Sequence, residues 1–393
     1  MGMAAIPTSR WAGRQLAELA SVTSSSQIAE IDATTLLGER AVLNGFRIPS
    51  LRSAGGGCRL FPARDGWIAL NLARPDDRDM LPALFEDGGL DPADDEAIAS
   101  RIALACEGEL VARGRELGLA LAGVAEKASG PPCAVATTGL QRAAPKHDAP
   151  LVVDLSALWA GPLAGHLLWS AGARLVKVES ATRPDAMREG DPQLFARLNQ
   201  GKASVRLDLR ASADRAALIA LIRRADMVIE AARPRALEQL GIFADALVRE
   251  TPGLIWLTIT GHGADPGGPR NWVGFGDDCG VAGGLSAAML AATGQPSFVG
   301  DAIADPLTGI MAAQSGWKHW REGIARRIIF SMSGIAQQAL RETMADGATA
   351  FAQQLRAWRS AEGQAFPAVR SRAVADVRPL GADNAAWLQD CPC

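Results

Sequence analysis

Short apolar runs alternate with stretches of helical spacing between residues 150 and 335. Residues 151–153 form a β-branched run suited to a buried parallel strand, and helical spacing follows over residues 163–171. Residues 174–178 form the next apolar run, and the alternation continues to a last strand expected over residues 328–332. This pattern predicts an α/β fold in which a doubly wound, parallel, Rossmann-like sheet carries helices on both faces.

The first 145 residues have a different pattern. An apolar run over residues 67–72 follows a turn, and residues 118–124 are expected to return as a second strand after a helical stretch. Residues 129–150 have the Pro- and Ala-rich composition of a linker. We therefore expect three parts: a small α+β domain over 1–145, a large Rossmann-like domain over 146–335, and a C-terminal helix and tail over 336–393 that pack on the large domain.

Composition and charge exclude several classes of protein. A chain of 393 residues suits two domains, and 48% hydrophobic with 21% charged residues is typical of a soluble globular protein. The net charge is −3 with both signs interspersed, so we expect no binding to nucleic acid or to membrane surfaces. No apolar run reaches the roughly 18 residues of a membrane span, and residues 1–14 lack the apolar stretch of a signal peptide.

The six cysteines are scattered and form no paired motif. They predict reduced thiols of a cytoplasmic protein. Cys391 and Cys393 stand close together, but no histidine or second cysteine pair accompanies them, so we expect a frayed tail and no metal site.

The turn after the first predicted strand of the large domain exposes backbone. Ala160, Gly161 and Pro162 follow Trp159 there, and proline suits the first turn of a helix. Free N–H groups at such a helix start favour an anionic ligand.

This turn belongs to an ordered series of motifs. Asp154 precedes it, residues 172–179 follow it, and Asn199, Lys202 and Ser204 come next. The series resembles the opening of the family III CoA-transferases, the group that includes formyl-CoA transferase and α-methylacyl-CoA racemase. The resemblance continues in segments 225–234, 258–269 and 300–309. In most relatives the small domain follows the large one, so the resemblance implies a permuted order here.

The resemblance also implies covalent chemistry at Asp305. In the family this aspartate attacks the acyl-CoA thioester, a mixed anhydride forms, and the returning CoA thiolate gives an aspartyl-CoA that passes CoA to a second carboxylate. The CoA thioester is then a substrate, and no tightly bound cofactor is expected. Asp305 before Pro306 also suits a helix N-cap, and Asp301 is the nearest rival. Gly283, Gly284 or the turn at Gly300 are expected to supply N–H donors to the oxyanion.

Residues that contact CoA are expected at the helix start and among the cations. For Lys177 and Arg188 an ordinary solvated role stays open. Arg233 aligns with the arginine that relatives place near the CoA pyrophosphate. The predicted set is Trp159, Ala160, Lys177, Arg188, Lys202 and Arg233.

Two departures from the family pattern bear on the reaction. Trp159 replaces the glutamine of formyl-CoA transferase and is expected at the pocket mouth, where it would favour bulkier acyl groups. Phe275 stands near the position of the racemase histidine and cannot abstract a proton, although His262 is a possible substitute.

The main prediction is therefore an acyl-CoA:carboxylate CoA-transferase. Two alternatives stay open: an acyl-CoA isomerase, racemase or lyase that uses Asp305 as a base, and a non-catalytic CoA-binding homologue. The expected partners are an acyl-CoA, a carboxylic acid acceptor and a second copy of the chain. Whether the two copies of this homodimer interlock, as the resemblance implies, stays open.

Overall fold

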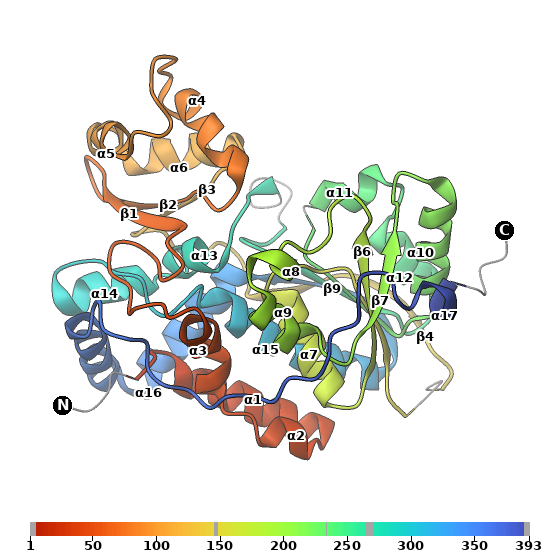
Figure 1. The fold of residues 1–393 in the computed structure, drawn as a ribbon. Helices are drawn as coiled ribbons and strands as arrows, with labels where there is room; N and C mark the ends of the chain where they lie inside the picture. Colours follow the sequence, from red (N-terminus) through yellow and green to blue (C-terminus); the bar gives the residue numbers. More distant parts are fainter. Residues whose placement is uncertain (1–4, 145–147, 233, 265–270, 389–393) are drawn as a thin grey trace.

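The computed structural model describes residues 5–144, 148–232, 234–264 and 271–388. Two sheets organise these residues (Figure 1). A seven-stranded sheet has the order β4-β10-β9-β8-β5-β6-β7, and a three-stranded sheet has the order β1-β2-β3.

Six strands of the large sheet are parallel, and the strand order reverses between β5 and β8. Every residue of β5 and β8 is buried, as expected for central strands covered on both faces. The predicted doubly wound α/β fold is confirmed. The strands are β5 (Leu151–Asp154), β6 (Arg174–Ser180), β7 (Ala203–Leu207), β8 (Met227–Glu230), β9 (Ile255–Thr260) and β10 (Ile324–Ser331).

Helices cover both faces of the large sheet. One face packs against α7 (Ala160–Ser170), α15 (Ala304–Glu322) and α16 (Met332–Ser360), and the other against α10 (Ser212–Arg224) and α12 (Ala244–Glu250). Short helices fill the remaining connections: α8 (Met187–Gly190), α9 (Pro192–Asn199), α11 (Pro234–Gln239), α14 (Leu285–Thr293) and α17 (Asn384–Leu388).

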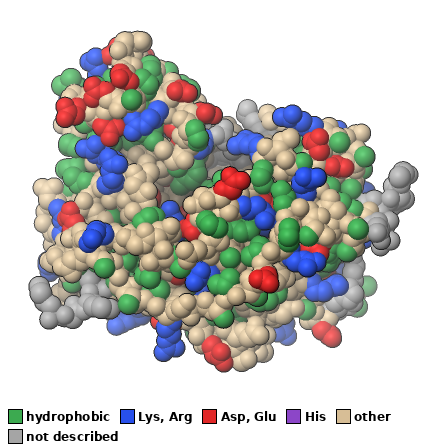
Figure 2. Space-filling model, in the orientation of Figure 1, with side chains coloured by type: hydrophobic (Ala, Val, Ile, Leu, Met, Phe, Trp, Pro, Cys, Tyr) green, Lys and Arg blue, Asp and Glu red, His purple; other side chains and the backbone are tan. Residues whose placement is uncertain are grey.

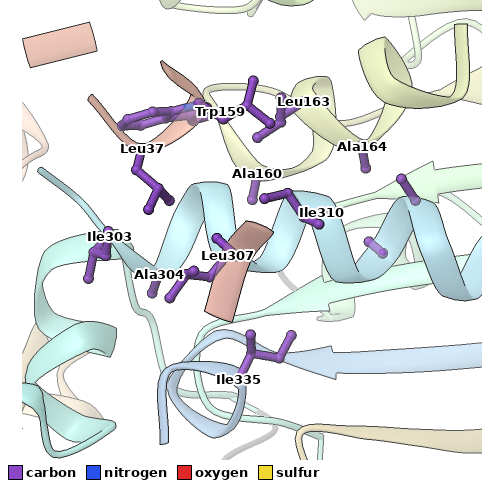
Figure 3. Close-up of a cluster of buried hydrophobic side chains, with 14 of the residues drawn as sticks. Leu37, Trp159, Ala160, Leu163, Ala164, Ile303, Ala304, Leu307, Ile310 and Ile335 are labelled. Carbon is purple, nitrogen blue, oxygen red and sulfur yellow. The ribbon is translucent and has the colours of Figure 1, made fainter. Parts of the chain in front are cut away.

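The first helices of the chain belong to the core of the large sheet. They are α1 (Ser9–Thr23), α2 (Ser26–Ala29) and α3 (Ala33–Leu43). Trp11 and Leu36 are fully buried in the same cluster as α7 and α15. Leu37 of α3 lies beside Trp159 in the close-up of this cluster (Figure 3). The division at residues 145 and 335 stays a prediction, but this packing shows that residues 9–43 share the large core.

A small unit lies at one end of the molecule (Figure 1). Its sheet is antiparallel: β1 (Cys58–Pro62), β2 (Trp67–Asn71) and β3 (Ala120–Gly123). One face packs on η1 (Pro75–Met80), α4 (Leu81–Phe85), α5 (Asp95–Leu104) and α6 (Glu107–Glu116). The other face packs on α13 (Gly276–Ala282), whose Val281 and Ala282 join its core. Helix α13 therefore packs between the small sheet and helices α15 and α16 of the large core.

The prediction of a linker over residues 129–150 is wrong for its central part. Strand β4 (Cys133–Gln141) pairs antiparallel with β10 and forms the edge of the large sheet. Most of its residues are exposed or half-buried, so the strand lacks the continuous buried apolar run of the central strands. Its partner lies far along the chain, so local composition could not reveal the pairing.

The visible surface carries no large patch of one charge. Lys and Arg side chains are interspersed with Asp and Glu over both parts of the molecule (Figure 2). Within the described residues, no helix is both long and apolar enough to span a bilayer.

Candidate active site

A cavity of about 340 Å³ lies at the carboxyl ends of the central strands. Segments that follow β5, β6, β8 and β9 line it, which places it where the strand order reverses. Open α/β sheets bind ligands at this point because adjacent connections leave in opposite directions. The lining comprises Arg74, Ala157, Leu158, Ala160, Gly161, Arg183, Ala231, Ala232, Ile259, Thr260, Gly261, Asn271, Trp272, Val273, Gly274, Phe275, Asp305 and Met332.

Asp305 is the carboxylate of this cavity. It stands in the first turn of α15, is half-buried, and its own N–H donates to the carbonyl of Ala302 at 2.9 Å. The N–H of Ala160, at the start of α7, interacts with the Asp305 carboxylate. Small residues allow α7 and α15 to approach closely, as Ala160, Ala164 and Ala304 show in Figure 3. Two helix N-termini thus converge on one carboxylate.

Burial raises the pKa of Asp305 to about 7, against the opposing effect of the Arg40 guanidinium. The nearby carboxylate of Asp277 raises it as well, while the N–H of Ala160 lowers it. A carboxyl group with a pKa near 7 changes its charge within the physiological range, which is common at functional sites.

Asp301 occupies a different environment. Its side chain is fully buried, and Oδ1 accepts a hydrogen bond of 2.9 Å from Nη1 of Arg40. Burial raises the pKa of Asp301 to about 7. Asp277 is close by and accepts a hydrogen bond of 3.0 Å from the N–H of Ala302. Asp301 does not line the cavity. Its hydrogen bond to Arg40 instead holds that guanidinium near Asp305.

Gly276 makes room for the Asp305 carboxylate. A Cβ on this glycine would lie 2.1 Å from Oδ2 of Asp305 and 2.3 Å from the carbonyl oxygen of Ala302. Both distances are shorter than any tolerated contact, so a larger residue would displace the carboxylate or the backbone that holds it.

A family model for CoA-transferase family III matches residues 150–367, which is more than half of the chain. The chain belongs to CoA-transferase family III. The matched segment holds Asp305, the start of α7 and the strands that end at the cavity. It excludes Arg40 and Arg74, which come from the preceding part of the chain.

Curated relatives match about two fifths of the chain. The succinyl-CoA–D-citramalate CoA-transferase of Chloroflexus aurantiacus is 34% identical over 169 residues, covering 41% of this chain and 42% of the relative. A probable fatty acyl-CoA transferase of Mycobacterium tuberculosis is 34% identical over 175 residues, covering 42% and 43%. The match thus spans about two fifths of the length of these relatives.

Solved structures give a partial likeness. The crystal structure of a hypothetical protein from Mycobacterium tuberculosis has 27% sequence identity and a TM-score of 0.45, and the match covers 55% of this chain and 59% of that chain.

Of the two neighbouring residues predicted to contact CoA, Ala160 and Trp159, only one lies at the cavity. Ala160 lines the cavity. Trp159 is buried in the large core, and the guanidinium of Arg40 lies 5.5 Å from its ring centre. It does not line the cavity, so the expectation that Trp159 shapes the pocket mouth is withdrawn.

The predicted lysines are held in buried ion pairs away from the cavity lining. Nζ of Lys202 contacts Asp154 at 2.7 Å, and burial lowers the pKa of Lys202 to about 8. Nζ of Lys177 contacts Asp185 at 3.0 Å, and although burial alone would lower its pKa, Asp154 and Asp185 raise it. Arg188 pairs with Glu179 at 2.5 Å. These cations therefore neutralise buried carboxylates at or just beyond the ends of β5 and β6.

The remaining predicted residues are placed as follows. Arg233 lies outside the described residues. Gly283 and Gly284 end α13, and their N–H groups donate to Cys279 and Val281, so neither is free to stabilise an oxyanion. Gly300 is buried and does not line the cavity. The glycines that do line it are Gly161, Gly261 and Gly274.

Two arginines of the cavity were not predicted from the sequence. Arg183 is exposed in the turn after β6, and the described residues offer it neither a hydrogen bond nor an ion pair. Its position after a strand could have identified it, because ligands bind at strand ends in such sheets. Arg74 donates from Nε to Asp77 at 2.8 Å and comes from the small unit, and no local signal relates it to the cavity.

Phe275 lines the cavity beside Asp305, whereas His262 is buried outside the lining. Burial lowers the pKa of His262 to about 3, so its imidazole is neutral.

Proposed function

We propose that this protein transfers CoA from an acyl-CoA to a carboxylic acid through a covalent intermediate on Asp305. The observation that carries the proposal is the position of Asp305: a half-buried carboxylate at two helix N-termini, facing a cavity at the strand ends. The CoA-transferase names of the curated relatives support the reaction class. The CoA thioester acts as a substrate, and the reaction needs no other cofactor.

The first half-reaction loads CoA onto the enzyme. A carboxylate oxygen of Asp305 attacks the thioester carbonyl, the C–S bond breaks, and CoA leaves as a thiolate. The product is a mixed anhydride between Asp305 and the acyl group. The thiolate then attacks the Asp305 carbonyl carbon, releases the acyl carboxylate and forms aspartyl-CoA.

The second half-reaction is the mirror image of the first. An acceptor carboxylate attacks aspartyl-CoA, the thiolate leaves, and it returns to the acyl carbon of the new anhydride. The acceptor leaves as its CoA thioester and the Asp305 carboxylate is regenerated. The N–H of Ala160 is placed to stabilise negative charge on oxygens at Asp305.

We propose that Arg183 and Arg74 contact the phosphates of CoA, because both arginines line the cavity and guanidinium groups match phosphate geometry. The apolar side chains of Trp272, Phe275 and Met332 would contact the pantetheine and acyl portions. Lys177, Lys202 and Arg188 leave the proposed CoA site, because none of them lines the cavity and each is held in an ion pair with a buried carboxylate.

The test traps the intermediate. Protein incubated with an acyl-CoA is analysed by intact mass, and a second sample is treated with hydroxylamine and mapped by peptide mass spectrometry. We expect a CoA adduct and a hydroxamate at Asp305, both absent in Asp305→Ala. Asp376→Ala, which changes an exposed aspartate, should behave like the wild type.

Other outcomes favour other functions. Turnover of acyl-CoA that depends on Asp305 but leaves no adduct would favour an isomerase, racemase or lyase with Asp305 as base. The absence of a base at Phe275 disfavours this function. Binding of CoA without any turnover would favour a non-catalytic homologue. The homodimer stays a prediction, and light scattering of the purified protein tests it.

A further inference from the structure

Three potential metal ligands meet beneath the cavity. His262 follows β9, and Asp278 and Cys279 stand in the first turns of α13. One ligand atom from each residue lies within 4.8 Å of the other two, and all three residues are buried. The three side chains do not line the cavity, but Gly261 and Gly274 beside them do.

The imidazole of His262 has an unused nitrogen. Its side chain is 3% exposed, and Nε2 has no hydrogen-bond partner within the described parts of the chain. A buried nitrogen without a partner loses the stabilisation that water would give, so such an atom is a natural position for a bound ligand.

Gly274 shows where this nitrogen points. A Cβ on Gly274 would lie 3.0 Å from Nε2 of His262 and 2.6 Å from Sγ of Cys279. The two ligand atoms therefore face the same space, which stays open because residue 274 has no side chain.

Neighbouring groups orient the other two ligands. Oδ1 of Asp278 accepts hydrogen bonds from Nδ2 of Asn71 at 2.7 Å and from the N–H of Phe275 at 3.0 Å. Oδ2 of Asp278 lies 3.9 Å from Sγ of Cys279. Sγ also lies 3.3 Å from the carbonyl oxygen of Gly261. The N–H of Phe275 also donates to Oδ2 at 3.2 Å, so both oxygens of this carboxylate are held in a defined direction, as supporting residues hold the ligands of metal sites.

We propose that Nε2 of His262, Oδ2 of Asp278 and Sγ of Cys279 bind a zinc ion. A thiolate, an imidazole and a carboxylate together are a donor set that zinc prefers, and hard cations such as Mg²⁺ avoid sulfur. Binding releases the thiol proton of Cys279 to solvent. The carbonyl oxygen of Gly261 or a water completes the coordination. This departs from the expectation of no metal site, because residues 262 and 279 are not close enough in sequence to form a recognisable motif.

The ion would fix the geometry of the cavity. It would join the end of β9 to α13, and α13 begins with Gly276, which borders the Asp305 carboxylate. Its role is positional, so the proposal holds or fails independently of the proposed CoA transfer.

Metal content and cobalt spectroscopy test the site. Protein purified without chelator should contain one zinc ion per chain by elemental mass spectrometry. Zinc-free protein titrated with Co²⁺ should show thiolate-to-cobalt absorption in the near ultraviolet. Cys279→Ser should lose that absorption, and His262→Phe should weaken zinc binding at least about tenfold. Asn71→Ala, which removes only the support of Asp278, should weaken it by about 10- to 100-fold.

Matched variants separate this site from adventitious binding. Cys133→Ser changes a half-buried thiol on β4 and should keep the cobalt spectrum. Replacing Cys391 and Cys393 by serine should keep it too. The proposal is overturned if wild-type protein binds neither metal, or if the signal survives Cys279→Ser and disappears with the terminal cysteines. Whether the wild-type protein binds zinc and cobalt is measured without any variant, so the proposal can be tested even if a variant fails to fold.

Discussion

Arg40 and Asp301 are 261 positions apart in the chain and share a hydrogen bond of 2.9 Å between Nη1 and Oδ1. The guanidinium lies 5.4 Å from the ring centre of Phe46 and 5.5 Å from that of Trp159, so aromatic rings and a carboxylate hold it in place. Helix α3, at the start of the chain, thus brings a positive charge to a site whose carboxylates lie more than 200 residues later. This charge opposes the effect of burial on Asp305.

Replacing Arg40 should move the pH dependence of the reaction. The attacking group is the ionised form of Asp305, whose pKa is raised by burial to about 7, so kcat/KM of the wild type should rise with pH and level off above 7. Arg40→Gln removes the opposing charge, so its midpoint should lie at higher pH. Steady-state rates from pH 5 to 9 measure this shift. Arg47→Gln, an exposed arginine bonded to the carbonyl of Gly363, is the control. Equal midpoints would refute the electrostatic role.

Asp305→Asn should change stability in a pH-dependent way. The folded pKa of Asp305 is about 7 and the ordinary value is 3.8, so the folded state binds its proton more tightly than the unfolded state. The stabilisation that the protonated group provides is fully present below pH 3.8 and is lost as pH rises through 7. An asparagine does not titrate. The variant should therefore gain stability relative to the wild type between pH 5 and pH 8, as urea unfolding would show. A constant difference across this range would contradict the raised pKa.

Gly276→Ala should lower activity strongly although it adds only one methyl group. The added Cβ would meet Oδ2 of Asp305 at 2.1 Å and backbone at Ala302 at 2.3 Å, so Asp305 must move. A shift of about 1 Å in a reacting group can cost about 100-fold in rate. We expect kcat to fall by at least about tenfold. Gly108→Ala is the control, because a Cβ there meets nothing within 4 Å and alanine favours its helix by about 1 kcal/mol. Similar kcat values in the two variants would contradict the close contact.

Arg183→Gln should weaken binding of the CoA thioester. A hydrogen bond to a charged group contributes about 1.5–3 kcal/mol, so KM for acyl-CoA should rise about tenfold or more while kcat changes little. Arg174→Gln provides a matched comparison, because Arg174 is exposed at the opposite end of β6. If both variants keep the wild-type KM, Arg183 does not contact CoA.

Lys202→Met should lower the free energy of unfolding and leave binding of the CoA thioester unchanged. Its ammonium pairs with the fully buried Asp154 at 2.7 Å and contacts the carbonyl of Pro162 at 3.0 Å. Removing one partner leaves a buried charge without compensation, which costs about 3–5 kcal/mol. Urea unfolding should show this loss, and KM for acyl-CoA should stay near the wild-type value. An increased KM with unchanged stability would restore Lys202 to the CoA site.

Local pattern was enough to predict the elements that surround the cavity. The run at residues 151–153 became β5 and the run at residues 174–178 became β6, because burial between helices requires apolar side chains in consecutive positions. Asp305 was identified from its flanking motif, and the structure places it in the cavity lining. Edge strand β4 was missed, since an edge strand needs little apolar sequence and takes its partner from another part of the chain.

The state of each charged side chain could not be predicted in the same way. A lysine in a strand and an arginine in a turn look alike in sequence, yet Lys177 is 2% exposed and paired while Arg183 is exposed at the cavity. Burial and ion pairing depend on which strand ends meet, and that information is spread over the whole fold.

The amino-acid sequence alone determined the α/β class and the order of its central elements, because periodicity and turn residues act over short distances. The segment that carries Asp305 followed from its resemblance to the family motif. Only the tertiary structure brings Arg40 into hydrogen-bonding contact with Asp301 and pairs Lys202 with Asp154. It also places His262 and Cys279 on either side of the same space beside Gly274. The physical reason is that electrostatic and coordination contacts act between side chains close in space, whatever their separation along the chain.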